Sequence, residues 1–169
     1  MSAGLRLYLA SPLGFAESTR HYLDCVREHL TKLGFLVYDP WISSENLKAV
    51  RNMSHAEDVR DSGRRIALLS EANKVIGENN ERAIRDSDVV LAILDGVDVD
   101  SGTASEIGFA AAIDLPVFGL RTDIRRTGEN EASIVNPQVQ WWIEHSGGTI
   151  ATKLENVFDL LKRHAQAQM

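Results

Sequence analysis

The chain has 169 residues, the length of one ordinary domain, and its composition of 44% hydrophobic and 25% charged residues is typical of a globular protein with a substantial core. Its formal net charge is -6 and its lysines and arginines are scattered, which argues against a nucleic-acid-binding or membrane-binding surface. No apolar run approaches the ~20 residues that cross a bilayer, and the N-terminus lacks a signal-peptide pattern. We therefore expect a single cytoplasmic domain over residues 1–169.

Short apolar runs bounded by turn residues alternate along the chain with segments of helical periodicity. The predicted strands are residues 5–10, 35–38, 89–94, 116–120 and 149–151. The predicted helices are residues 16–33, residues 66–85, a helix that opens with Thr103, residues 132–145 as a helix or helical turns, and residues 153–164. The polar segment 43–63 has a weak helical pattern, and we interpret it as helical pieces that lie over one strand end.

Strands that alternate with helices favour right-handed crossovers and a parallel sheet covered on both faces. We expect an α/β fold of three layers, flavodoxin-like (Rossmann-like), with five parallel strands in the order 2-1-3-4-5. Ligands bind such sheets where the strand order reverses, which here is between the first and third strands. Residues 8–15 and the acidic loop of residues 95–106 are therefore expected to share one crevice.

Three carboxylates, Asp95, Asp98 and Asp100, precede Glu106 in this loop. The spacing of Thr103 and Glu106 fits a capping box, which needs no catalysis. However, crowding acids at a helix start is repulsive, which folding alone would not favour. The helix N-terminus would keep Glu106 ionised, which is the state that a nucleophile requires. A like-charged neighbour would instead shift one of the carboxyls towards its protonated form, which is the state that a general acid requires.

Other chemistries find little support in the sequence. The loop fails the calcium pattern because Gly102 and Phe109 stand at ligand positions, and the five histidines lack zinc spacing, so we expect no metal. The single cysteine, Cys25, is expected to be a buried thiol, since it lies within a helical pattern. Trp41 is a candidate either for stacking on a planar ligand or for the core.

Three stretches resemble the nucleoside 2-deoxyribosyltransferase family: YLASP at residues 8–12, DP at residues 39–40, and above all DSGTASEIGFA at residues 100–110. The resemblance covers residues 5–148. It implies that Glu106 is the nucleophile, that Asp100 assists proton transfer to and from the base, and that Tyr8 orients the nucleophile. It also implies a set of substrate-binding residues: Ser11, Phe15, Asp39, Trp41, Asn80, Gly102 and Asn136.

Two of these positions carry further expectations. Asn80 stands where the family often has aspartate, a departure that affects an acid role and base preference. Asn136 matches an asparagine that reaches the sugar hydroxyls, often from a neighbouring subunit. The resemblance therefore implies a homo-oligomer with shared sites, which acts on deoxyribonucleosides and free nucleobases without cofactor, metal, nucleic acid or membrane.

The implied reaction moves 2-deoxyribose between purine or pyrimidine bases by a retaining double displacement through a deoxyribosyl ester of Glu106. A second hypothesis is an N-glycosidase, in which water resolves the ester. Nucleotide-specific versions need a phosphate cradle, and the apolar loop 11–15, with no cation nearby in the sequence, does not resemble one. A third hypothesis is a non-catalytic nucleotide-sensing module, because this architecture hosts many functions.

Overall fold

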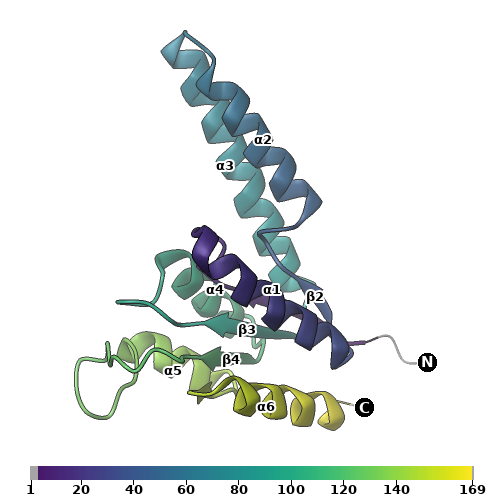
Figure 1. Cartoon of the computed structure of the whole chain (residues 1–169), viewed down its shortest axis with the longest axis vertical. Helices are drawn as coiled ribbons and strands as arrows, with labels where there is room; N and C mark the ends of the chain where they lie inside the picture. The colour runs from purple at the N-terminus through teal and green to yellow at the C-terminus, as the bar shows by residue number, and fades with distance from the viewer. Residues whose placement is uncertain (1–3, 169) are drawn as a thin grey trace.

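The computed structural model describes residues 4–168, which form a parallel sheet of five strands between two layers of helices (Figure 1). The strands pair in the order β2-β1-β3-β4-β5. Their bounds are β1 Arg6–Ala10, β2 Leu36–Tyr38, β3 Val89–Ile93, β4 Val117–Leu120 and β5 Ile150–Ala151. The predicted flavodoxin-like fold and its strand order are confirmed.

Each face of the sheet is covered by its own set of helices. The helices α1 (Glu17–Lys32) and α6 (Leu154–Ala167) pack on one face. The opposite face is covered by the C-terminal part of α3 (Ser62–Arg85), by α4 (Ser101–Ala112) and by α5 (Pro137–His145). None of the helices within residues 4–168 combines the length and the apolar character that crossing a membrane requires.

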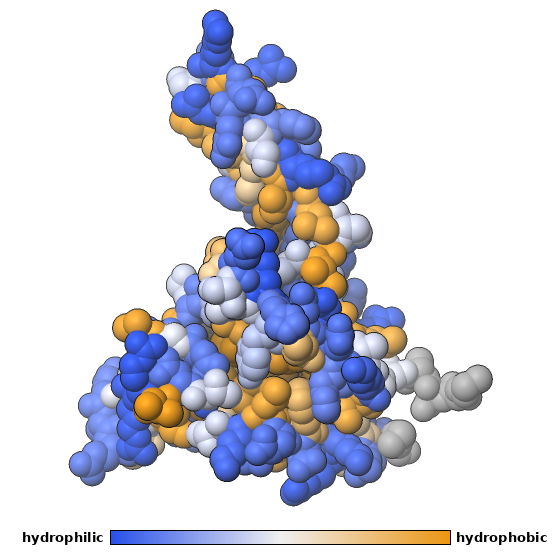
Figure 2. Space-filling model, viewed as in Figure 1, coloured by the Kyte–Doolittle hydropathy of each residue, from blue (hydrophilic) through white to orange (hydrophobic). Residues whose placement is uncertain are grey.

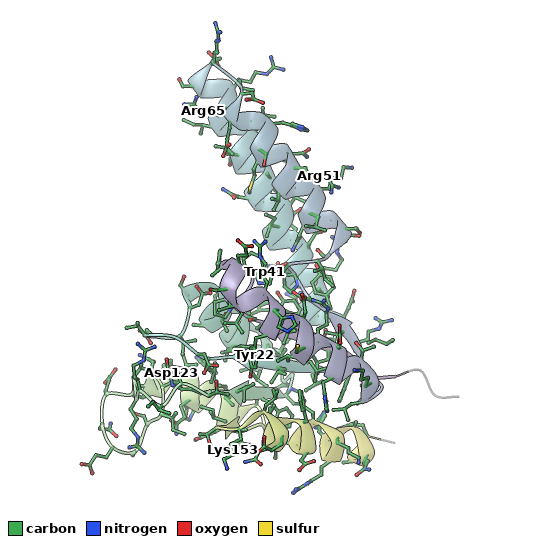
Figure 3. The ribbon with its side chains drawn as sticks, in the orientation of Figure 1. Tyr22, Trp41, Arg51, Arg65, Asp123 and Lys153 are labelled. Atoms are coloured by element: carbon green, nitrogen blue, oxygen red, sulfur yellow. The ribbon has the colours of Figure 1, made fainter. Side chains whose placement is uncertain are left out.

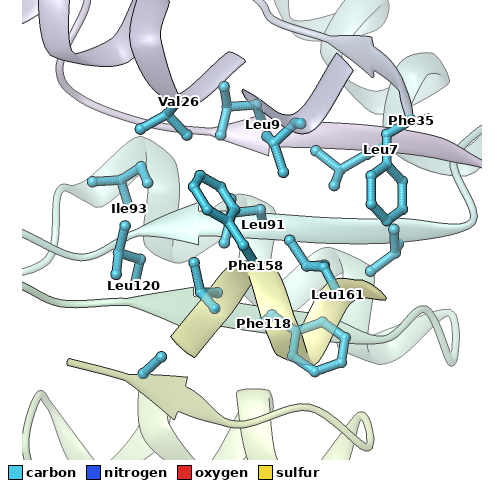
Figure 4. Packing of buried hydrophobic residues seen from close by; sticks show 14 of the residues in the cluster. Leu7, Leu9, Val26, Phe35, Leu91, Ile93, Phe118, Leu120, Phe158 and Leu161 are labelled. Atoms are coloured by element: carbon cyan, nitrogen blue, oxygen red, sulfur yellow. The ribbon is translucent and has the colours of Figure 1, made fainter. Parts of the chain in front are cut away.

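Alternation along β1 decides which side chain reaches the site. Successive residues of a strand point to opposite faces, so Leu7 and Leu9 pack with Val26 of α1 and Phe158 of α6 (Figure 4). Tyr8 therefore points to the other face, where it joins the core formed with α3, α4 and α5. This parity places a phenol beneath α4.

The helices α2 (Ser44–Glu57) and α3 form a hairpin that projects from the body of the molecule (Figure 1). Its tip is covered by hydrophilic side chains, whereas apolar ones gather nearer the body (Figure 2). Residues 43–63 are largely helical, as expected, but they do not form pieces that lie over a strand end. Instead, α2 is one continuous helix that leads away from the sheet (Figure 1). The buried apolar residues between the two helices are small: Ala49 and Ala56 of α2 and Ala72 of α3. For this reason the sequence of the segment shows little apolar periodicity.

Two further expectations are corrected. The fourth helix begins at Ser101, with Asp100 as its N-cap, and not at Thr103. Cys25 is exposed and not buried, because the buried stripe of α1 runs through Leu23 and Val26 and leaves position 25 on the outer side.

Candidate active site

Glu106 lies in the second turn of α4, above the buried phenol of Tyr8. The Tyr8 hydroxyl donates a hydrogen bond of 2.6 Å to Glu106 Oε1. Asn80, on α3, directs its Nδ2 at the same oxygen from 3.5 Å. No hydrogen bond from residues 4–168 reaches Oε2, so one carboxylate oxygen faces two donors while the other has no partner among these residues.

Asp100 occupies the position just before α4. Its Oδ2 accepts hydrogen bonds from the Thr103 backbone N–H at 3.0 Å and from Thr103 Oγ1 at 3.4 Å. The predicted capping box of Thr103 with Glu106 is therefore wrong, since the helix starts earlier and Asp100 caps it. Glu106 is freed from capping because its carboxyl turns inward to Tyr8.

The environment raises the pKa of Glu106 to about 7 from its ordinary value of 4.5. Burial is the largest cause, the charge of Asp100 adds to it, and the hydrogen bond from Tyr8 opposes it. The expectation that the helix N-terminus keeps this carboxyl ionised is wrong, because desolvation outweighs it. Burial, followed by the charge of Glu106, also raises the pKa of Tyr8, so the phenol stays a proton donor.

A cavity of about 330 Å³ adjoins Glu106 and lies where the hairpin meets the body. Its size is at the lower end of the range for small-molecule sites. The cavity combines aromatic and aliphatic walls with a few polar groups. Its lining residues are Ser11, Phe15, Pro40, Trp41, Asn46, Val50, Ile76, Asn80, Asp100, Gly102, Thr103 and Glu106.

Trp41 forms one wall of the cavity, at the root of the hairpin (Figure 3). Its Nε1 donates to the Ser11 carbonyl at 2.8 Å, and its ring meets Phe15 edge-on at 4.5 Å. A Cβ at Gly14 would lie 2.0 Å from the indole, so the close approach of this loop requires glycine. The sequence left open whether Trp41 stacks on a ligand or belongs to the core. In the structure, Trp41 packs against the core and also lines the cavity.

The structure brings most of the sequence-predicted site residues together, but three lie outside the cavity lining. Tyr8 is one of them, and it reaches the site through its hydrogen bond to Glu106. The Asp39 carboxylate is buried, and it accepts from Arg27 Nη1 at 3.0 Å and from the Trp41 backbone N–H at 2.9 Å. Asp39 thus supports the wall of the cavity and does not form it. Asn136 caps α5 through a hydrogen bond of 2.9 Å from the Gln138 N–H.

Sequence reasoning missed several lining residues: Pro40, Asn46, Val50, Ile76 and Thr103. Asn46 and Val50 are four residues apart on α2, and Ile76 is four residues before Asn80 on α3. A matched four-residue spacing on two adjacent helices was the available signal, but it required knowing that α2 is one continuous helix that pairs with α3.

The other acids of the loop after β3 serve its shape. Asp95 accepts from the Thr122 N–H at 2.5 Å and from the Asp123 N–H at 2.7 Å, and buried Arg121 donates to the Gly96 carbonyl at 3.1 Å. These bonds tie the loop after β3 to the loop after β4. Within residues 4–168, no group of three His, Cys, Asp or Glu side chains is arranged to hold a metal ion.

The fold and this geometry define a class of protein: a flavodoxin-like α/β protein with two carboxylates beside an aromatic-walled cavity at the switch point of its sheet. The family model for nucleoside 2-deoxyribosyltransferases matches residues 7–147. The chain belongs to the nucleoside 2-deoxyribosyltransferase family, and this membership supports a deoxyribosyltransferase-like enzyme. None of the curated protein sequences matches the chain significantly.

Two solved structures share the fold. One is a conserved protein from Enterococcus faecalis V583, with 24% identity, coverage of 99% of this chain and 100% of that chain, and a TM-score of 0.66. The other is a 2-deoxyribosyltransferase from Bacillus psychrosaccharolyticus, with 20% identity, coverage of 90% of this chain and 89% of that chain, and a TM-score of 0.61.

Proposed function

We propose that this protein transfers 2-deoxyribose between nucleobases by a retaining double displacement through a covalent ester on Glu106. The observation that carries the proposal is the asymmetric environment of the Glu106 carboxylate. Tyr8 and Asn80 both donate to Oε1, which leaves Oε2 for attack, and Asp100 shares the cavity with Glu106. Family membership supplies the sugar and base classes.

The chemistry follows from these positions. Oε2 forms a bond to the anomeric carbon while the bond to the base breaks, its electron pair passes to the base nitrogen, and Asp100 delivers a proton there. A second base then attacks the anomeric carbon of the ester from the side opposite to Glu106. Asp100 takes back a proton from this base, and the bond to Oε2 breaks, which releases the Glu106 carboxylate. Two inversions return the original configuration.

The cavity favours nucleosides over nucleotides. None of its lining residues is lysine, arginine or histidine, whereas phosphate sites use such cations or clustered backbone N–H groups. The sequence suggested that loop 11–15 has no cation nearby, and here the structure adds one. Arg20 Nε donates to the Gly14 carbonyl at 3.0 Å, but Arg20 does not line the cavity.

The proposal includes a homo-oligomer, because Asn136 lies outside the cavity of its own chain. A neighbouring copy could bring Asn136 to the sugar. Mixing inactive Glu106→Ala subunits with Asn136→Ala subunits and reassociating them would then restore part of the activity. Failure to restore activity in a confirmed oligomer would remove Asn136 from the site.

Base exchange tests the function directly. The protein is incubated with deoxyinosine and adenine, or with thymidine and adenine, and the products are separated by chromatography. We expect deoxyadenosine, and we expect acid-quenched protein to carry one deoxyribosyl group on the peptide that contains Glu106. Glu106→Ala should abolish both products. Glu78→Gln, which removes an exposed carboxylate of a different helix, α3, should abolish neither.

Each alternative has its own outcome. Free deoxyribose with no exchanged nucleoside would identify an N-glycosidase and refute transfer. No turnover of any nucleoside, together with ligand binding that Glu106→Ala leaves unchanged, would identify a binding module.

A further inference from the structure

A chain of side-chain amides runs through the root of the hairpin to Glu106. The Asn79 carboxamide donates to Asn46 Oδ1 at 3.2 Å, and Asn46 Nδ2 donates to Asn80 Oδ1 at 2.9 Å. Asn80 Nδ2 then faces Glu106 Oε1 at 3.5 Å. At the far end, the guanidinium of Arg82 donates to Asn79 Oδ1. We call these four residues, Arg82, Asn79, Asn46 and Asn80, the amide relay.

Both ends of the amide relay fix its direction. A guanidinium only donates and an ionised carboxylate only accepts, so each amide between them must accept on the Arg82 side and donate on the Glu106 side. Asn46 is fixed a second time, since its Nδ2 also donates to the Pro40 carbonyl at 3.2 Å. The assignment of oxygen and nitrogen in each amide therefore follows from the network.

Burial gives the amide relay its rigidity. Asn46 is 5% exposed and Asn79 is 7% exposed, so neither amide can exchange its partners for bulk water. Turning one amide over would set donors against donors and acceptors against acceptors, and an unmade buried hydrogen bond is costly. The three amides therefore keep one orientation together.

We propose that Asn79 and Arg82 are positioning residues, which act through Asn46 to hold the Asn80 amide with its N–H towards Glu106. Neither Asn79 nor Arg82 lines the cavity beside Glu106, so neither is placed to touch a substrate there. The inference deepens the proposed function and rests on it for its catalytic meaning. Its structural content is the polarity of Asn80.

This polarity also gives a reason for asparagine at position 80. An aspartate could accept from Asn46 as Asn80 does, but its second oxygen would face the Glu106 carboxylate and repel it. The amide instead presents a donor. The relay therefore suits Asn80 to supporting an anion on Glu106 and not to delivering a proton as an acid.

Reversing the relay is the sharpest test. In Asn79→Asp the carboxylate still accepts from Arg82 but cannot donate to Asn46. The Asn46 amide then turns over to donate to this charged acceptor, because that bond is stronger than the neutral bond to the Pro40 carbonyl which the turn gives up. Asn46 then presents its oxygen to Asn80, whose own oxygen turns towards Glu106. The ionised form of Glu106 loses a donor and meets an acceptor, so its pKa rises.

The titration of Glu106 is followed by ¹³C NMR of its carboxyl carbon, assigned with Glu106→Gln, so that the readout needs no turnover. The wild-type midpoint is expected near 7. In Asn79→Asp it should rise by about one pH unit, and base exchange at neutral pH should fall about fivefold, because the ionised fraction of Glu106 falls from about one half to about one tenth. The charged or titratable groups that face Glu106 are Tyr8 on β1 and Asp100 before α4, and Glu81 on α3 lines a shallow cavity on the other side of it.

Two controls separate the relay from the added charge. Asn73→Asp adds the same charge at an exposed position of α3 and should leave the midpoint unchanged. In an Asn80→Ala background the charge at position 79 remains but the relay is cut. Asn79→Asp should then produce a clearly smaller shift than in the wild-type background.

The outcomes are distinct. Equal shifts in both backgrounds would reduce the effect to charge and overturn the relay, as would no shift at all in Asn79→Asp. A lower melting temperature with an unmoved midpoint would assign Asn79 a purely structural role. If wild type exchanges no base but the midpoint moves as expected, the relay stands and the proposed function fails.

Discussion

The Tyr8 hydroxyl lies 2.6 Å from Glu106 Oε1, a contact between residues 98 positions apart in the chain. It joins the interior strand β1 to α4, and the buried phenol stacks on Tyr38 with 5.6 Å between ring centres. A buried carboxyl without such a donor would remain protonated, because desolvation penalises the anion. Tyr8 thus keeps Glu106 able to ionise near neutral pH.

Removal of the phenol hydroxyl should make Glu106 harder to ionise. In Tyr8→Phe we expect the pKa of Glu106 to rise above 7, because the bond from Tyr8 favours the ionised carboxyl and lowers this pKa. Loss of a hydrogen bond to a charged group corresponds to roughly a 10- to 100-fold decrease in kcat/KM for base exchange. Carboxyl ¹³C titration and initial rates measure the two effects.

Tyr38→Phe is the matched control for Tyr8→Phe, since it removes a neighbouring phenol hydroxyl while it keeps the stacked ring. It should leave the Glu106 midpoint in place. An unchanged or lowered midpoint in Tyr8→Phe would contradict the role of the hydroxyl, whatever happened to the rate.

Ionisation of Glu106 should cost folding stability. Its pKa in the folded protein is about 7, above the ordinary 4.5, so the folded state holds the proton more tightly than the unfolded state. The corresponding stability is fully present below pH 4.5 and is lost as the pH rises through 7. At about 1.4 kcal/mol per unit, the loss is about 3 kcal/mol.

Replacement by a neutral isostere removes this dependence. Glu106→Gln should therefore be more stable than wild type at pH 8 by a few kcal/mol and nearly equal to it at pH 4.5. Urea unfolding at both pH values measures the difference. Glu78→Gln removes an exposed carboxylate and should show no such pH trend relative to wild type. A pH-independent effect of Glu106→Gln would contradict the prediction, because it would mean that the Glu106 carboxyl of the wild type ionises as easily in the folded as in the unfolded state.

Asp100 combines two roles that substitution can separate. Asparagine caps helices as well as aspartate does, so Asp100→Asn should keep the hydrogen bond to the Thr103 N–H and retain stability. It cannot deliver a proton to the base, and kcat should fall by about 10²- to 10⁴-fold. Asp100→Ala should lose the same catalysis and also about 1 kcal/mol of stability.

Melting curves and kcat for both Asp100 variants complete this comparison. A rate near wild type in Asp100→Asn would leave the residue only as a cap. Equal losses of stability in both variants would mean that the cap depends on charge and not on hydrogen bonding.

The sequence was sufficient for the sheet and for the proximity of the two carboxylates at the candidate site, because both depend on local patterns. Apolar runs and turn residues mark β1 and β3, and the fixed topology of parallel sheets brings their ends together. Glu106 and Asp100 share one short motif, so their proximity required no long-range information.

The rest of the site depends on packing that no local pattern records. The hairpin has an alanine seam, so Asn46 could not be placed without its partner α3. Asp39 was expected to bind the substrate, but its buried carboxylate is paired with Arg27. The pKa of Glu106 depends on burial beside Tyr8, and a sequence reading based on the helix N-terminus gave the opposite direction.

The contact between Arg27 and Asp39 should be the most sensitive support of the cavity. The Asp39 side chain is 0% exposed, and its oxygens accept from Arg27 Nη1 at 3.0 Å and from the Trp41 N–H at 2.9 Å. Arg27→Met keeps the aliphatic length but leaves a buried carboxylate without its cation. Breaking such a pair from one side costs about 3–5 kcal/mol, which urea unfolding would measure.

Arg27→Met combined with Asp39→Asn removes the charge as well and should recover most of the loss, because an amide oxygen still accepts from Trp41. A single variant as stable as wild type, or a double variant no better than the single, would show that water reaches Asp39 and that the ion pair does not hold the cavity wall.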